Sequence, residues 1–327
     1  MSGRLRPIAL AAALAVAVAG CVRYAPLSDT YEGPDDLPTN LAERYAYQDV
    51  ATPHEEDALK ERRSFTLKEI TIPFGPAGDA LADAADEDEI VFEYYDLEGD
   101  ELTPVIVLLP ILNGNIRVSR YFARYFTNHG WAALVIDRDS DLLREGLLEP
   151  EQEIRRNLTA YMRVLDWVDA HPELDGEALG LFGISFGGID ALMLAALDER
   201  VDAVVAAMAG GDLAYLVMNT SYWSVARRVH RMLRKEDMSR DSLRQQIEDM
   251  IDTDPLALAP YVDAQDVFLV MTRTDMIVPF EAQQALRRRL GQPETLYLPT
   301  GHRTSVVYFP LLRSSSYEFF ARQFAGG

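Results

Sequence analysis

The sequence predicts an α/β protein with a mainly parallel central sheet and helices on both faces of that sheet. From residue 64 onward, strand-like segments alternate with helix-like segments. Several strand-like segments are apolar throughout, such as 104–109 (PVIVLL) and 131–136 (WAALVI). A strand without polar alternation is typical of a sheet that is buried on both faces. Alternating elements of this kind form layered α/β domains with a parallel sheet.

The individual elements follow from local patterns along the chain. Residues 66–72 alternate like a strand, and further strands are expected at 90–95, 178–182, 201–208, 266–272 and 295–298. Residues 117–129 carry aromatic side chains at helical spacing, which we expect to pack in the core. Residues 151–170 form a long amphipathic helix that closes at His171-Pro172. Other helices are expected at 188–197, 215–233, 242–251, 281–290 and 304–324.

The first twenty residues resemble a bacterial lipoprotein signal peptide. Arg4 and Arg6 precede an apolar run at 8–19, which is too short to span a bilayer as a stable helix. The sequence VAGC at 18–21 follows, and the resemblance implies that Cys21 is lipidated as the first mature residue. The chain would then be anchored in the bacterial cell envelope, at the outer membrane or the periplasmic side of the inner membrane. A plain secretory signal is the alternative, because 17–19 (AVA) also fits a cleavage site.

The segment that follows the signal is expected to be a tether. Residues 21–63 contain several prolines and acidic residues and little periodicity. A short helix within 41–47 or 55–63 is compatible with the sequence. Residues 64–327 are then long enough for one large α/β domain with a sizeable core and an insertion.

Charge and cysteine content exclude some function classes. The formal net charge is −21, and removal of residues 1–20 with Arg4 and Arg6 lowers it to −23. Nucleic acid is therefore an unsuitable partner. Cys21 is the only cysteine, so the chain has no internal disulfide and no cysteine metal site.

The segment 183–187 (GISFG) is the motif that carries the most information about chemistry. It reads G-x-S-x-G and stands between an apolar strand-like run and a helix-like run. This is the context of a nucleophile elbow, in which Ser185 occupies a tight, strained strand-to-helix turn. Glycines stand on both sides because side chains there would clash, and the N-terminus of the following helix offers free N–H groups to an anion.

With this motif, residues 64–324 resemble the α/β-hydrolase family, and among its members the esterases and dienelactone hydrolases. The family orders its triad as serine, acid and histidine along the chain. The resemblance assigns the acid to Asp275, after the strand at 267–272, and the base to His302, after the strand at 295–298. Asp212 is the alternative acid, because some members carry the acid one strand earlier. Such loops lie at the carboxyl ends of the strands, where open sheets hold their sites.

The resemblance also implies an oxyanion hole made of two backbone N–H groups. One belongs to Phe186, directly after the nucleophile. The other comes from the loop after residue 109, for which we expect Leu112, with Ile111 as the alternative. Asn113 and Asn115 either assist or simply shape the turn before the next helix.

An insertion at about 211–262 stands where the family usually carries a helical cap. Its apolar side chains either line a substrate pocket or pack the cap onto the main domain. Arginines 227, 228, 231 and 234 with Lys235 form a basic stripe, which is a solvated face or a contact for anionic groups.

Together these observations predict an envelope-anchored serine hydrolase that cleaves small-molecule or lipid-like esters through an acyl-enzyme, without a metal or organic cofactor. Serine supplies a nucleophile that needs a base, imidazole titrates near neutral pH, and the carboxylate fixes the imidazole tautomer. A peptidase or amidase, a lipase-like enzyme and a non-catalytic binding protein are the alternatives, because the cap and not the triad selects the substrate.

Overall fold

The structure is a computed structural model that describes residues 22–46, 54–74, 89–97, 99, 102–138, 150–235 and 238–326. The predicted signal segment and Cys21 therefore lie outside the described residues. No helix within these ranges is both long enough and apolar enough to cross a membrane.

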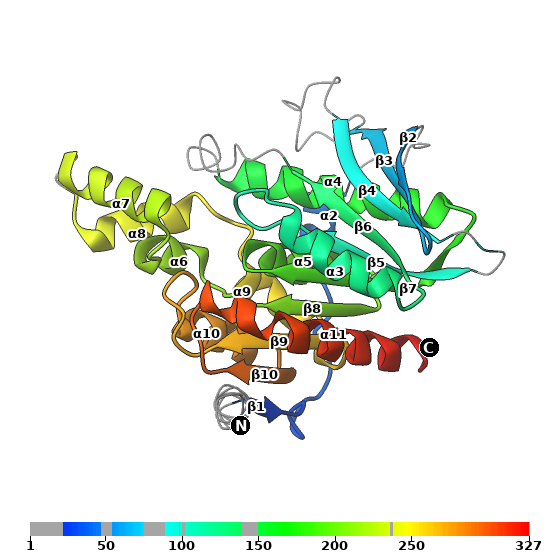
Figure 1. Cartoon of the computed structure of the whole chain (residues 1–327). Helices are drawn as coiled ribbons and strands as arrows, with labels where there is room; N and C mark the ends of the chain where they lie inside the picture. The colour runs from blue at the N-terminus through cyan, green and yellow to red at the C-terminus, as the bar shows by residue number, and fades with distance from the viewer. Residues whose placement is uncertain are drawn as a thin grey trace, which may run out of the picture.

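The described residues contain one ten-stranded sheet in the order β1-β10-β9-β8-β7-β5-β6-β4-β3-β2 (Figure 1). The strands from β10 to β6 are parallel, while β1 and the β4-β3-β2 end pair antiparallel. The predicted, mainly parallel α/β sheet is thus confirmed. The strand bounds are β1 Arg23–Ala25, β2 Glu55–Glu61, β3 Thr66–Pro73, β4 Glu89–Asp96, β5 Thr103–Leu109, β6 Ala132–Asp137, β7 Leu174–Ile184, β8 Ala203–Ala207, β9 Val267–Thr272 and β10 Glu294–Leu298.

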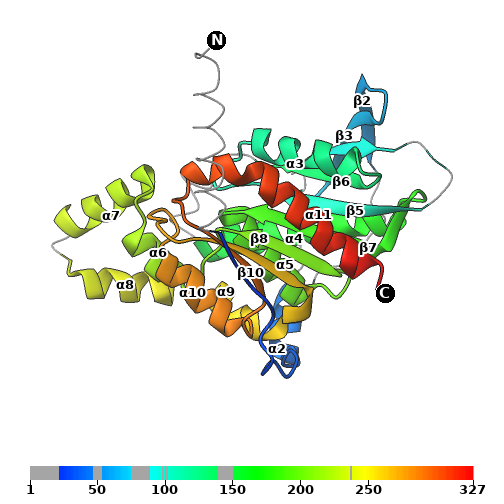
Figure 2. The same cartoon turned by 60° about the horizontal axis from the view of Figure 1, so that its bottom comes forward.

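Helices cover both faces of this sheet (Figures 1 and 2). On one face, Phe122 and Phe126 of α3 pack with Phe320 of α11. On the other face, Leu158 of α4 and Ile189 of α5 belong to a second buried cluster. The helix bounds are α2 Thr39–Tyr45, α3 Arg117–Thr127, α4 Pro150–Ala170, α5 Phe186–Leu197, α6 Leu213–Asn219, α7 Trp223–Lys235, α8 Arg240–Asp249, α9 Pro255–Leu258, α10 Phe280–Arg289, the 3-10 helix η5 Thr304–Tyr308 and α11 Phe309–Phe324.

The segment expected to be a tether is partly built into the domain. Strand β1 pairs with β10, and α2 buries Tyr45. Residues 55–61, for which a helix was one expectation, form β2 instead, because they pair with β3 over nearly their whole length. Every residue of β2 is exposed and most are charged, as suits the outer strand of a sheet. Pairing with β3 thus overrides the helical propensity of Glu, Ala, Leu and Lys.

The predicted cap range contains α6, α7 and α8, and α7 and α8 project from one end of the molecule in both views (Figures 1 and 2). The single helix expected at 215–233 is two helices. The chain breaks at Thr220, whose hydroxyl donates to the carbonyl of Ile277 (2.7 Å) and accepts from the N–H of Tyr222 (3.0 Å). The hydrogen bond from Thr220 to Ile277 therefore joins the cap to the loop that follows β9.

Candidate active site

Ser185 occupies a strained turn between β7 and α5. Its backbone has φ 59° and ψ −120°, a conformation that side-chain-bearing residues rarely adopt. Its N–H donates to the carbonyl of Ala207 on β8 (2.7 Å), which holds the turn to the neighbouring strand. A Cβ on Gly183 would lie 2.1 Å from the carbonyl oxygen of Gly187. A Cβ on Gly187 would lie 2.6 Å from that of Leu109, so the backbone leaves no space for a side chain at either position.

Asp275 and His302 are brought together from two loops at the carboxyl end of the sheet. Asp275 follows β9 and His302 follows β10, and Nδ1 of His302 lies 2.8 Å from Oδ2 of Asp275. The same carboxylate accepts from the hydroxyl of Thr272 (2.7 Å) and from the N–H groups of Ile277 (2.8 Å) and Val278 (2.9 Å). Both oxygens therefore have fixed donors. The acceptor at Oδ2 favours a proton on Nδ1, which leaves Nε2 free to act as a base.

Gln283 braces the Asp275 loop from inside the core. Its side chain is fully buried, with its oxygen accepting from the N–H of Thr272 (3.1 Å) and its nitrogen donating to the carbonyl of Val278 (2.8 Å). The amide nitrogen also lies 3.4 Å from Oδ2 of Asp275. No sequence motif pointed to Gln283, because its contacts with Thr272 and Val278 depend on how α10 packs against the end of β9 and the loop that follows it.

Asp212, the alternative acid, is engaged elsewhere. Its carboxylate caps α6 by accepting from the N–H of Tyr215 (2.8 Å) and pairs with Arg244 of α8 (2.8 Å). These contacts give Asp212 a structural role in seating the cap.

No hydrogen bond joins the hydroxyl of Ser185 to His302 within the described part of the chain. Contacts of this kind often tighten only when substrate binds. The complete triad of Ser185, His302 and Asp275 therefore stays a prediction. The hydrogen bond described above joins Asp275 to His302 directly, and Ser185 follows β7, which is separated from β9 in the sheet by β8.

The two residues predicted to form the oxyanion hole line the same cavity as Ser185. Leu112 reaches it from the loop after β5, and Phe186 is the first residue of α5. The side chain of Asn113 accepts from the N–H of Asn115 (3.3 Å), and that of Asn115 accepts from the N–H of Arg117 (3.0 Å). These bonds favour the interpretation in which the asparagines shape the turn.

A buried ionic cluster lies beneath this loop, and no sequence motif predicted it. Arg138, directly after β6, donates to the carbonyl of Ile111 (2.9 Å), and its guanidinium lies 5.0 Å from the centre of the Phe186 ring. The carbonyl of Ile111 and the N–H of Leu112 belong to one planar peptide group and point in opposite directions. By holding that carbonyl, Arg138 orients the N–H of Leu112, and its cation–π contact steadies Phe186.

Asp190 of α5 completes this cluster. Its carboxylate accepts from the hydroxyl of Tyr161 (3.0 Å) and lies 3.5 Å from the guanidinium of Arg138. Burial raises the pKa of Asp190 to about 7, although Arg138 and the Tyr161 hydrogen bond lower it. A signal was present in the sequence, because Asp190 is a lone acid within the apolar run 189–197, and a buried acid requires a partner.

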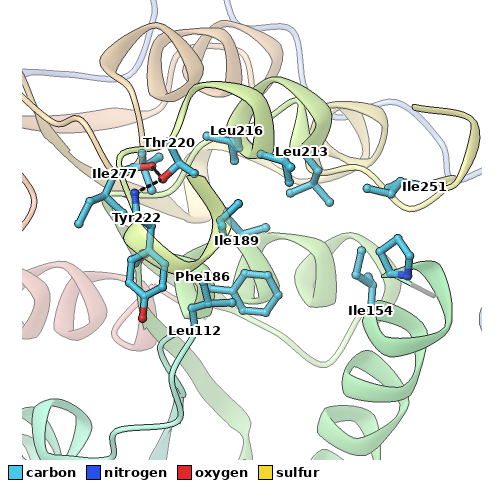
Figure 3. A pocket seen from close by; sticks show the side chains of 15 residues that line it. Leu112, Ile154, Phe186, Ile189, Leu213, Leu216, Thr220, Tyr222, Ile251 and Ile277 are labelled. Carbon is cyan, nitrogen blue, oxygen red and sulfur yellow. Dashed lines mark hydrogen bonds between the residues drawn. The ribbon is translucent and has the colours of Figure 1, made fainter. Parts of the chain in front are cut away.

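The cavity beside Ser185 has a volume of about 150 Å³ and an almost entirely apolar lining. Figure 3 shows Leu213, Leu216 and Ile251 on the cap side, with Leu112, Phe186 and Ile154 opposite them. Ser185, Thr220 and Tyr222 are the polar side chains among the described residues that line it, and none of the lining residues is charged. The described ranges also contain no group of three or more His, Cys, Asp or Glu side chains suited to a metal ion.

A model of the X-Pro dipeptidyl-peptidase (S15) family matches residues 36–289. An acetyl xylan esterase from Paenibacillus sp. has a similar fold, with a TM-score of 0.67 and 17% identity over 87% of this chain and 91% of that one. Acetyl xylan esterase 1 from Thermoanaerobacterium sp. gives 0.62 and 14% over 87% and 96%. These likenesses show the α/β-hydrolase fold.

A curated relative is an uncharacterized protein found in two strains of Mycobacterium tuberculosis. It is 29% identical over 143 residues, which are 43% of this chain and 31% of that protein. The match thus spans about a third of the length of the relative.

Proposed function

We propose that this chain, which belongs to the X-Pro dipeptidyl-peptidase (S15) family and is a serine hydrolase of α/β-hydrolase fold, cleaves carboxylic esters with an apolar acyl group. The observation that carries the proposal is the apolar, uncharged cavity that opens at Ser185. An apolar acyl group would leave water on entering it, which favours binding.

In the proposed reaction, Oγ of Ser185 attacks the ester carbonyl while Nε2 of His302 takes the hydroxyl proton. Asp275 keeps the imidazole oriented and stabilises its positive charge. The N–H groups of Phe186 and Leu112 donate to the developing oxyanion. His302 then gives its proton to the leaving alcohol, and the acyl group remains on Ser185. Water, deprotonated by His302, releases the acid and restores the enzyme.

Dipeptidyl-peptidase activity is the second candidate, because the matching family model carries that description. An enzyme that removes dipeptides must accommodate the free ammonium group of its substrate, and a buried ammonium needs an anionic partner. The described residues that line the cavity include no carboxylate. The lining therefore favours the ester over the peptide.

Fluorophosphonate labelling of the full chain, combined with rates on p-nitrophenyl esters and on an X-Pro-p-nitroanilide, tests this proposal. We expect labelling and ester hydrolysis that are lost in Ser185→Ala and His302→Ala, with little anilide cleavage. A higher kcat/KM on the anilide would favour the peptidase. A folded chain that takes no label and cleaves neither substrate would support the binding protein instead.

We further propose that Cys21 carries a lipid that anchors the enzyme in the cell envelope, with the signal-like segment 1–20 removed. Metabolic labelling with a fatty acid should mark the wild-type chain and not Cys21→Ser, which should leave the membrane fraction. An unlabelled, released wild-type chain would instead indicate a plain secretory signal.

A further inference from the structure

We propose that a second cavity, inside the cap, binds the distal part of a long acyl chain whose carbonyl carbon lies at Ser185. This inference rests on the proposed ester hydrolysis and adds the substrate class, namely esters of medium- and long-chain fatty acids.

The second cavity lies between α7 and α8 and has a volume of about 290 Å³. Val229 and Met232 of α7 line one side, and Leu243 and Ile247 of α8 line another. Val229 and Leu243 belong to the buried cluster of the cap. The cap therefore encloses apolar space between its helices.

The two cavities adjoin each other. Pro150, Val217, Val225 and Ile251 line both the cavity at Ser185 and the cavity in the cap. These four residues come from the start of α4, from α6, from α7 and from the loop after α8. Because they are shared, an apolar chain that passes between them leaves the first cavity and enters the second without crossing a polar layer.

The volumes indicate how an acyl chain divides between the two cavities. A dry cavity of about 150 Å³ lined by aliphatic and aromatic side chains holds one benzene molecule, about six carbon atoms. The cavity at Ser185 has this volume, so it fills with a short acyl group. A longer chain needs further apolar space, and the cap cavity of about 290 Å³ supplies it. Each methylene buried there improves binding by about fourfold.

The polar residues at the cap cavity suggest where the chain ends. Arg228 and Gln246 are the polar side chains among the described residues that line it, and both have access to solvent. The methyl end of a chain too long for both cavities would leave beside them. Among the described residues that line this cavity there is no carboxylate, so none of them would bind a positively charged group on the substrate.

The experiment measures kcat/KM of the full chain on p-nitrophenyl acetate, butyrate, octanoate and laurate. We expect the value to rise from butyrate to laurate in the wild type by at least tenfold. Met232→Trp, which fills the cap cavity, should lower the laurate-to-butyrate ratio by at least tenfold. Val225→Phe, which narrows the passage between the cavities, should lower the same ratio. Arg231→Trp, an exposed position on the same helix, is the matched control and should leave the ratio unchanged.

The outcomes separate this inference from the proposed function. Hydrolysis of acetate and butyrate with no activity beyond octanoate would overturn the long-chain inference and leave the esterase intact. A laurate-to-butyrate ratio that stays constant in both Met232→Trp and Val225→Phe would also overturn it. A folded wild-type chain that hydrolyses none of the esters and takes no fluorophosphonate label would overturn the proposed function itself. Labelling of Ser185 in each variant reports whether it is folded.

Discussion

The sheet domain and the cap hold their side chains in place to very different degrees. In the sheet domain, every residue of β8 and β9 is buried, and the turn at Ser185 and the Asp275 loop are fixed by short hydrogen bonds. In the cap, the buried cluster consists of Met218, Val225, Val229 and Leu243, and a cavity lies beside it. The difference indicates that the sheet fixes the geometry of the reaction, whereas the cap can change its lining and so its substrate at little cost in stability.

The largest expected effect contrasts the two candidate acids. Asp275→Asn should keep the fold but lower kcat on an ester by about 10⁴-fold, because the amide no longer stabilises the imidazolium or its tautomer. Asp212→Asn is the matched control and should change kcat by less than about fivefold, because Asn also caps helices. The comparison is made by steady-state kinetics. A larger loss of kcat for Asp212→Asn than for Asp275→Asn would assign the acid role to Asp212.

A second prediction concerns the positioning role of Arg138. Arg138→Met should lower kcat by about 10²-fold with a smaller change in KM, because the N–H of Leu112, the proposed oxyanion donor, loses its orientation. Arg138→Lys should restore part of the rate through a hydrogen bond to the carbonyl of Ile111. Equal losses in Arg138→Met and an exposed control such as Arg231→Met, or a change confined to KM, would contradict this role.

The same substitution in the sheet domain and in the cap should have unequal effects on stability. Leu181 of β7 and Leu243 of α8 are both fully buried. Leu181→Ala should lower the free energy of unfolding by about 2–5 kcal/mol. Leu243→Ala should lower the midpoint of global unfolding much less and instead increase hydrogen exchange within α7 and α8, because the cap can open locally. Equal losses of unfolding free energy for the two variants in denaturant titrations would mean that the cap and the sheet unfold as one unit.

The smallest expected effect is a pH dependence from Asp190. Its pKa is raised to about 7 in the folded state, above the ordinary value of 3.8, so the folded protein binds the additional proton between these pH values. Stability from this group is therefore present below about pH 4 and is lost as pH rises towards 7. Asp190→Asn should remove this contribution, and its Tm should fall less than that of the wild type between pH 4 and 7, by several degrees. Parallel Tm curves would exclude the contribution.

The parts of the site that could be predicted are those encoded locally or by strand order. The turn at Ser185 needs glycines at fixed spacing, and those glycines are visible in the sequence. Asp275 and His302 follow two successive parallel strands, so sheet topology brings their loops together. The contacts of Arg138 with Ile111 and Phe186 could not be predicted, because they depend on how the segments after three different strands pack together. The strand at 55–61 could not be predicted either, because only its pairing with β3 gives these residues an extended conformation.

Strand β1 has a consequence for how far the enzyme can stand from a membrane. A free tether over residues 21–63 would reach up to about 140 Å. Strand β1 instead begins at Arg23 and is fastened to β10, so only Val22 separates position 21 from the sheet. If Cys21 carries the proposed lipid, the chain between Cys21 and the start of β1 at Arg23 spans roughly 7 Å at most. The β1–β10 end of the sheet would then lie at the bilayer, and the enzyme would take its substrates from that membrane surface.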